Sequence, residues 1–208
     1  MRRKILSLES AHNILEPYLE DLVASIRNGF EDYLKISQYA QSFENKISYK
    51  VRTKASIIHE HISGHLSANF QKYPDVTAKE WNNIFGLKIK NDLFLRVKKL
   101  NPDYSITSYM TKQAKDYLRQ LSIPGFPEEP TLLIAGYIPE YNWSGIRDIC
   151  ITCWDGEHLR WIFDVEQYAA EQIELPFAEN IDHREVIKRA NLIIRGRNIN
   201  LDDSPTNN

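Results

Sequence analysis

Hydrophobic residues in the first third of the chain recur at intervals of three and four, the spacing of a buried helical face. The first such stretch follows Ser10, a potential N-cap, and contains Pro17, where the helix is expected to kink or restart. A second break is expected at Gly29, after which the helical spacing resumes. We therefore expect an N-terminal helical part over residues 1–72, completed by a third helix that starts at Val51.

The third helix carries two stripes. Its buried stripe is formed by Val51, Ala55, Ile58, Ile62, Leu66 and Phe70. A polar line, about 100° around the helix from the first, is formed by Arg52, Ser56, His59 and Ser63. A polar line at the edge of a core is typical either of a binding site or of a set of satisfied hydrogen bonds, and the pattern alone leaves both interpretations open.

Beyond residue 72 the spacing changes from helical to alternating. Leu87 and Ile89 alternate with lysines, and Leu95 and Val97 alternate with cations on a return strand. This alternation predicts a hairpin whose apolar residues face inward, and a three-residue loop over 91–93 keeps the two faces in register.

The pattern after the hairpin predicts one short helix over residues 107–121 and three strands over 131–138, 146–154 and 158–164. Asp155-Gly156 is a strong signal for a tight hairpin turn between the last two strands. The order α-α-α-β-β-α-β-β-β-α indicates a single α+β domain over residues 1–175. Its N-terminal helices would pack on a mostly antiparallel sheet of about five strands, with helices covering one face of that sheet. Residues 176–208 are expected to form a tail with one possible helix and a disordered end.

Composition narrows the function classes. A formal net charge of −2 over 208 residues excludes a positive field over the whole protein, so nucleic-acid binding requires a local cationic patch. No apolar run reaches the roughly 18–20 residues that span a bilayer, and the basic start is not followed by the apolar segment of a secretion signal. We expect a cytoplasmic protein with no membrane partner.

Cys150 and Cys153 are the only cysteines, and both fall in a predicted strand. Strand residues three apart point to opposite faces, so we expect buried free thiols and no disulfide or redox motif. His61 and His65 have the i, i+4 spacing of a zinc-peptidase helix, but Ile62 stands where that motif requires glutamate. We therefore expect no metal and no cofactor, with His61 and His65 on a solvated face.

Arg52 and His59 share one helical face, about 10 Å apart along the axis. This Arg-x6-His arrangement is similar to the Arg-x4–6-His motif of the HEPN ribonuclease family. The resemblance implies acid–base work by His59 at a scissile phosphate, with Arg52 stabilising the developing charge. The alternative is that Arg52 binds a nearby carboxylate or carbonyl and that His59 is a half-buried core histidine.

Arg96 and Lys98 share one face of the return strand with Phe94, and two lysines stand across the hairpin. Cations beside a ring indicate a phosphate-contacting patch, although a solvated outer face of a sheet has the same pattern. A PD-(D/E)xK nuclease needs an acid where Arg96-Val97-Lys98 begins, so a metal nuclease of that type is not expected. Motifs for nucleotide hydrolysis, dinucleotide binding and serine hydrolysis are missing from the sequence.

A group of short segments covers residues 52–59, 95–100, 111–113, 136–139 and 146–165. These segments resemble a loose set of uncharacterised bacterial and prophage proteins, often encoded beside a helix-turn-helix regulator fused to a zinc peptidase domain. The resemblance covers about residues 50–165. It implies a toxin–antitoxin or phage-defence locus and assigns no chemistry.

Six polar residues at the ends of different elements fall within this resemblance: Arg52, His59, Arg96, Lys98, Thr111 and Gln113. We expect them to converge in a cationic pocket that accepts a phosphate or a carboxylate, with an internal hydrogen-bond network as the alternative. The leading expectation is an accessory or regulatory protein that binds a cognate partner protein, RNA or DNA without a catalytic cycle. The alternatives are a metal-independent ribonuclease toxin and a structural protein that forms a homo-oligomer through its C-terminal helix.

Overall fold

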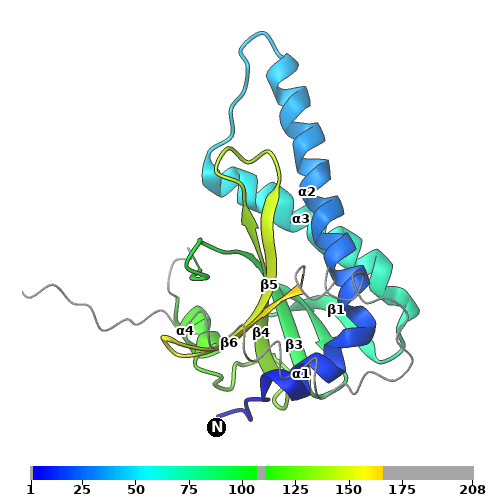
Figure 1. Ribbon diagram of the computed structural model, residues 1–208, viewed down its shortest axis with the longest axis vertical. Helices are drawn as coiled ribbons and strands as arrows, with labels where there is room; N and C mark the ends of the chain where they lie inside the picture. Colours follow the sequence, from blue (N-terminus) through cyan, green and yellow to red (C-terminus); the bar gives the residue numbers. More distant parts are fainter. Residues whose placement is uncertain (1, 107–110, 166–208) are drawn as a thin grey trace, which may run out of the picture. The chain divides into compact units, whose positions relative to one another are not determined.

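A computed structural model describes residues 2–106 and 111–165 (Figure 1). These residues belong to one compact unit, Met1–Ala169. The tail over 176–208, with its expected helix and disordered end, lies outside the described residues.

The chain begins with two helices that meet at Pro17. Helix α1 (Leu8–Leu15) is followed by a 3-10 turn, η1 (Glu16–Tyr18), and α2 (Leu19–Ser42) starts directly after it. The restart expected at Pro17 is confirmed. The N-cap expected at Ser10 is wrong, because the Ser7 hydroxyl accepts the hydrogen bond from the Ser10 N–H at 3.2 Å. The helix therefore begins one turn earlier than its apolar spacing indicates.

Helix α2 passes through Gly29 without a break, so the interruption expected there is wrong. Gly29 instead permits contact with α3 (Val51–Asn69), which continues into a second 3-10 turn, η2 (Phe70–Lys72). A Cβ at Gly29 would lie 2.5 Å from Ile62 Cγ1 and 2.6 Å from the Ile62 nitrogen. The missing side chain thus sets the closest approach of the two helices.

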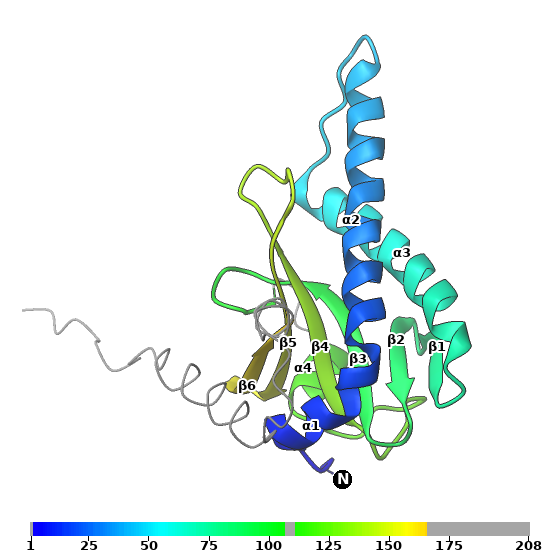
Figure 2. The same cartoon turned by 45° about the vertical axis from the view of Figure 1, so that its right-hand side comes forward.

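The buried stripe of α3 is largely as expected. Ile58, Ile62 and Leu66 are fully buried against α2 and the sheet, whereas Val51 is 56% exposed. Val51 is the first residue of α3, which crosses α2 beside the sheet (Figure 2). None of the helices in the described part of the chain is long and apolar enough to cross a membrane.

The described residues contain one sheet whose six strands lie side by side in chain order. The strands are β1 (Val76–Trp81), β2 (Ile84–Ile89), β3 (Leu93–Lys99), β4 (Thr131–Pro139), β5 (Ile146–Asp155) and β6 (His158–Asp164). Neighbours are antiparallel except β3 and β4, which are parallel and are joined through α4 (Lys112–Leu118). The α+β class is confirmed, and β1 is the strand that the alternation did not reveal.

The β2–β3 hairpin keeps its expected faces with a different register. Leu87 pairs with Leu95 and Ile89 with Leu93, so the loop is 90–92 and not 91–93. Sliding the return strand by two residues preserves which side chains face inward, because side chains alternate with a period of two. Leu87, Ile89, Leu95 and Val97 are all buried in one core, as predicted.

Helices cover both faces of the sheet, which corrects the expectation of a single covered face. Helices α1–α3 pack on the face that carries Leu95 and Val97. The other face carries Phe94, which has no exposed surface and packs with Tyr117 of α4 and with Phe126. The strand face that carries Phe94 is therefore a second core and not a solvated surface.

Cys150 and Cys153 are free and buried, as expected, and they lie in different cores. Burial raises the pKa of each thiol to about 12. Neither sulfur supplies a thiolate near neutral pH, so the two residues serve packing.

Candidate anion-binding site

The site forms where strand β2 stops pairing with β3. The β2–β3 ladder ends at Leu95, whereas β4 pairs with β3 as far as Lys99. Arg96 and Lys98 follow directly after the last residue paired with β2. As residues i and i+2 of a strand, they project from the same face. This places two cationic side chains next to each other beside an open stretch of sheet edge.

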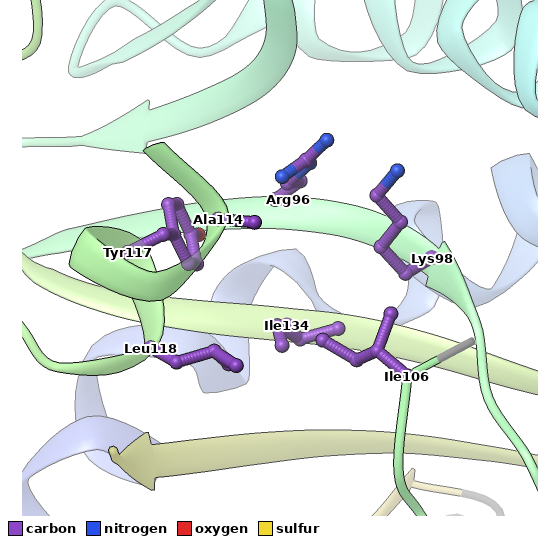
Figure 3. Close-up of a pocket in the computed structure, with 7 residues that line it drawn as sticks. All are labelled: Arg96, Lys98, Ile106, Ala114, Tyr117, Leu118 and Ile134. Carbon is purple, nitrogen blue, oxygen red and sulfur yellow. The ribbon is translucent and has the colours of Figure 1, made fainter. Parts of the chain in front are cut away.

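A small pocket lies beneath the two cations (Figure 3). It encloses about 20 Å³, roughly the room of one water molecule. Its lining residues are Arg96, Lys98, Ile106, Ala114, Tyr117, Leu118 and Ile134. Figure 3 shows the nitrogen-bearing ends of Arg96 and Lys98 pointing to the same side, away from the aliphatic side chains. The apolar slot therefore supports the stems of the cations and leaves their charged ends free to bind.

Neither cation is neutralised within the described part of the chain. Both side chains are half-buried, and neither forms a salt bridge or a hydrogen bond with any residue described. The Arg96 guanidinium carbon lies 5.9 Å from the centroid of the Tyr117 ring. Burial lowers the pKa of Arg96, and burial together with the Arg96 charge lowers the pKa of Lys98 to about 8. Because a desolvated cation without an anionic partner is costly, this pair departs from ordinary surface cations.

His59 of α3 is the third polar group of the site. Burial and, after it, the positive charges of Lys98 and Arg96 lower the pKa of its imidazole to about 4. The imidazole is therefore neutral at pH 7 and lies within electrostatic range of both cations. No hydrogen bond to this ring is found among the residues that the structure describes.

Thr111 and Gln113 are placed elsewhere, at the start of α4. The Thr111 hydroxyl accepts a hydrogen bond from the Ala114 N–H at 3.1 Å and caps the helix. The Gln113 side-chain amide donates to the carbonyl oxygen of Asn82 at 3.3 Å. Neither residue lines the pocket, and both agree with the alternative of an internal hydrogen-bond network.

Arg52 is also separate from the pocket lining. Its side chain is exposed, and its carbonyl oxygen accepts a hydrogen bond from the Ser56 hydroxyl at 3.0 Å. Two helical turns separate it from His59, about 10 Å along the axis. Of the six candidates, the structure therefore places Arg96 and Lys98 together at the pocket, with His59 of α3 within electrostatic range of both.

The residues that the sequence analysis missed are the walls of the site, Ile106, Tyr117, Leu118 and Ile134. Tyr117 and Leu118 fall within the helix expected over residues 107–121, but the periodicity of a helix does not show which face of a sheet it covers. The Tyr117 hydroxyl donates to the Leu133 carbonyl oxygen at 2.7 Å, which fixes the ring beneath Arg96.

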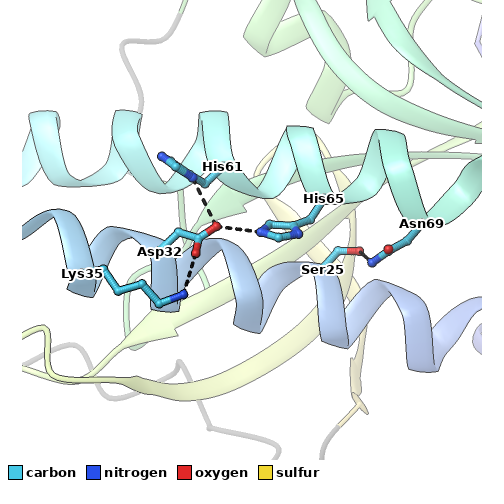
Figure 4. A network of polar contacts seen from close by, with 6 residues as sticks. All are labelled: Ser25, Asp32, Lys35, His61, His65 and Asn69. Atoms are coloured by element: carbon cyan, nitrogen blue, oxygen red, sulfur yellow. Dashed lines mark hydrogen bonds and ion pairs between the residues drawn. The ribbon is translucent and has the colours of Figure 1, made fainter.

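The remaining histidines of α3 join the two long helices (Figure 4). One carboxylate oxygen of Asp32 in α2 lies 2.8 Å from His65 Nε2 and 3.4 Å from His61 Nδ1. Hydrogen bonds from His65 and then Lys35 lower the pKa of Asp32 to about 2. Both imidazoles are half-buried, which corrects the expected solvated face. Among the described residues, no group of His, Cys, Asp and Glu has an arrangement that holds a metal ion.

No protein-family model matches the chain, and neither the curated proteins nor the solved structures contain a match. The fold and the site define the protein as a two-core α+β protein with a half-buried cationic cluster formed by Arg96, Lys98 and the neighbouring His59. Its function is argued from that cluster.

Proposed function

We propose that the protein binds an anion, a phosphate or a carboxylate, through Arg96 and Lys98. The observation that carries this proposal is that two adjacent, half-buried cations have no carboxylate partner in the described part of the chain. An arginine fork and a lysine ammonium form strong charge-assisted hydrogen bonds with either kind of anion. A bound anion would offset the cost of holding two like charges out of water.

The biological setting that we propose is an accessory or regulatory protein of a bacterial mobile-element, toxin–antitoxin or phage-defence locus. The resemblance of residues 50–165 supports this setting, and a cognate partner protein or nucleic acid would carry the anion. Binding without a catalytic cycle agrees with a site that holds two cations and one neutral imidazole. An aqueous, cytoplasmic location is part of the same proposal.

A metal-independent ribonuclease remains the alternative, and the geometry supports it less. It requires Arg52 and His59 at the same phosphate, whereas the Arg52 side chain is exposed and two helical turns away. The groups that act electrostatically on His59 are Lys98 and Arg96. A phosphate bound beside His59 would therefore be neutralised by these two cations and would not need Arg52.

The titration of Lys98 tests the proposal. Sulfate is a suitable probe because it stays a dianion across the range of measurement. Lys98 must be protonated to bind it, and its pKa is about 8 in place of the usual value near 10.5. We expect sulfate affinity, measured by isothermal titration calorimetry, to fall by about tenfold per pH unit once the pH exceeds the pKa of Lys98 in the unliganded protein, about 8.

The matched control is Lys98→Arg, because a guanidinium keeps its charge throughout this range. This variant is expected to bind sulfate with an affinity that does not fall between pH 7 and pH 10. Absence of sulfate binding to the wild type at pH 7, or an identical pH profile in the two proteins, contradicts the proposal.

A further inference from the structure

We propose that the ligand is the dianion of a phosphate monoester, held jointly by Arg96, Lys98 and His59. This inference rests on the proposed function of the same site and assigns the chemistry of its ligand. It also assigns His59 as a ligand-contacting residue that works with the strand cations and independently of Arg52.

The charge of the cluster favours a dianion. Arg96 and Lys98 supply two positive charges, and no carboxylate of the described residues neutralises either. A carboxylate or a phosphodiester carries one negative charge and leaves one desolvated cation uncompensated. A phosphate monoester carries close to two negative charges at pH 7, because its second pKa is near 6.

The number of donors agrees with the charge. A phosphate monoester presents three terminal oxygens, whereas a diester and a carboxylate present two each. The site offers a planar fork on Arg96 and an ammonium on Lys98, and α3, which packs against β3, carries one imidazole N–H on the neighbouring His59. Each terminal oxygen can therefore have its own protein partner.

The ligand also changes the electrostatic environment of His59. In the empty site, burial and the charges of Lys98 and Arg96 keep the imidazole neutral. Lys98 and Arg96 of β3 are the charged groups of the described chain that lower the pKa of the His59 imidazole. Arg52 is exposed and lies two helical turns from His59 along α3. A dianion between Lys98 and Arg96 reverses the sign of the local field and favours imidazolium. Binding is therefore accompanied by proton uptake at His59.

The charge of the site points to one terminal phosphate and not to a run of backbone phosphates. The chain carries a net charge of −2, and Arg96 and Lys98 supply two positive charges, whereas a run of backbone phosphates is bound along an extended positive surface. The terminal phosphate of a nucleotide or of a nucleic-acid strand has the required chemistry. The site would bind the phosphate of such a ligand without contacting its base.

Titration calorimetry of the full-length protein at about pH 7 tests the inference with methyl phosphate, dimethyl phosphate and acetate. Methyl phosphate is expected to bind at least tenfold more tightly than the other two, since its dianion compensates both cations and accepts one more charged hydrogen bond. Repeating the titration in buffers with different ionisation enthalpies measures the protons taken up. We expect net uptake of more than half a proton in the wild type.

His59→Gln retains a side-chain N–H donor but cannot take up the proton. It is expected to bind methyl phosphate more weakly and with little proton uptake, while its sulfate affinity stays flat from pH 5 to pH 7. Equal binding of methyl phosphate and dimethyl phosphate overturns this inference, and so does unchanged proton uptake in His59→Gln. Either result leaves the proposed anion site intact if sulfate still binds. Failure of every anion to bind overturns both.

Two further ligands distinguish the source of the phosphate. A nucleoside 5′-monophosphate represents a free nucleotide, and a 5′-phosphorylated oligonucleotide represents a strand end. Each is compared with its 5′-hydroxyl counterpart. Tighter binding of either phosphorylated form supports the inference, and loss of that difference in Lys98→Met assigns it to this site. Equal binding of the phosphorylated and hydroxyl forms in both pairs contradicts the inference.

Discussion

Replacing Lys98 by methionine is expected to stabilise the unliganded protein by about 1–2 kcal/mol at pH 7 and to abolish sulfate binding. Methionine has nearly the volume of the lysine stem, so it fills the same space beside Ile106 without a buried charge. A site that holds cations out of water in order to bind a ligand lowers the stability of the fold. A substitution that raises stability and abolishes binding is therefore the result expected of a binding site. Urea unfolding followed by tryptophan fluorescence measures the stability.

The stabilisation by Lys98→Met depends on pH with a defined sign. The folded pKa of Lys98, about 8, lies below its unfolded value. Below pH 8 both states are protonated and the folded state carries the full penalty, whereas above pH 8 wild-type Lys98 loses its proton and the protein gains stability. The advantage of the methionine variant should therefore shrink between pH 8 and pH 10.

Lys4→Met is the matched control for this experiment. Lys4 is exposed, and its carbonyl accepts a hydrogen bond from Thr131 at the start of β4, whereas Lys98 pairs with Gly136 further along that strand. Removing this charge is expected to change stability by less than about 0.5 kcal/mol and to leave sulfate binding intact. A Lys98→Met protein that is less stable than the wild type at pH 7 would show that Lys98 has stabilising partners.

Gly29→Ala is expected to destabilise the protein by about 3 kcal/mol, although alanine is the better helix former by about 1 kcal/mol. The new methyl group would lie 2.5 Å from Ile62 Cγ1, 2.6 Å from the Ile62 nitrogen and 2.8 Å from its Cα. Two of these atoms are backbone, so a change of rotamer cannot relieve the overlap and the helices must separate. Because α3 also carries His59, sulfate affinity should fall as well.

Gly64→Ala provides the internal control in α3. Nothing lies within 4 Å of a Cβ built at Gly64, so only the helix propensity changes. This substitution is expected to stabilise the protein by about 1 kcal/mol. Chemical denaturation of the two variants side by side gives opposite signs if the α2–α3 crossing is correct. A stabilising Gly29→Ala would contradict that crossing.

The fold class could be predicted because most helices and strands show their hydrophobic periodicity within their own stretch of sequence. The inward residues of the β2–β3 hairpin were identified correctly even though its register is shifted by two, since alternation does not distinguish registers of equal parity. Strand β1 was missed because five of its six residues, 76–80, are only partly buried or exposed, which gives no hydrophobic repeat. Which face α4 would cover is decided by the parallel β3–β4 crossover, a contact between distant segments.

The candidate site was predicted in part for the same reason. Arg96 and Lys98 share a face by alternation, and His59 falls on the polar line of α3, so their residue types and directions follow from the sequence. Thr111 and Gln113 are hydrogen-bonded within the fold, because a threonine that starts a helix serves as its N-cap. The burial that distinguishes Arg96 and Lys98 from surface cations depends on Tyr117 and Ile134, which come from other elements.

Crystals of the protein grown with selenate would test the anion site most directly, because selenate mimics sulfate and its selenium scatters anomalously. We expect an anomalous peak within hydrogen-bonding distance of the Arg96 guanidinium and the Lys98 ammonium, on the side that Figure 3 shows both groups facing. A well-ordered Arg96 and Lys98 with no selenate between them, at a concentration that saturates other sites, would contradict it.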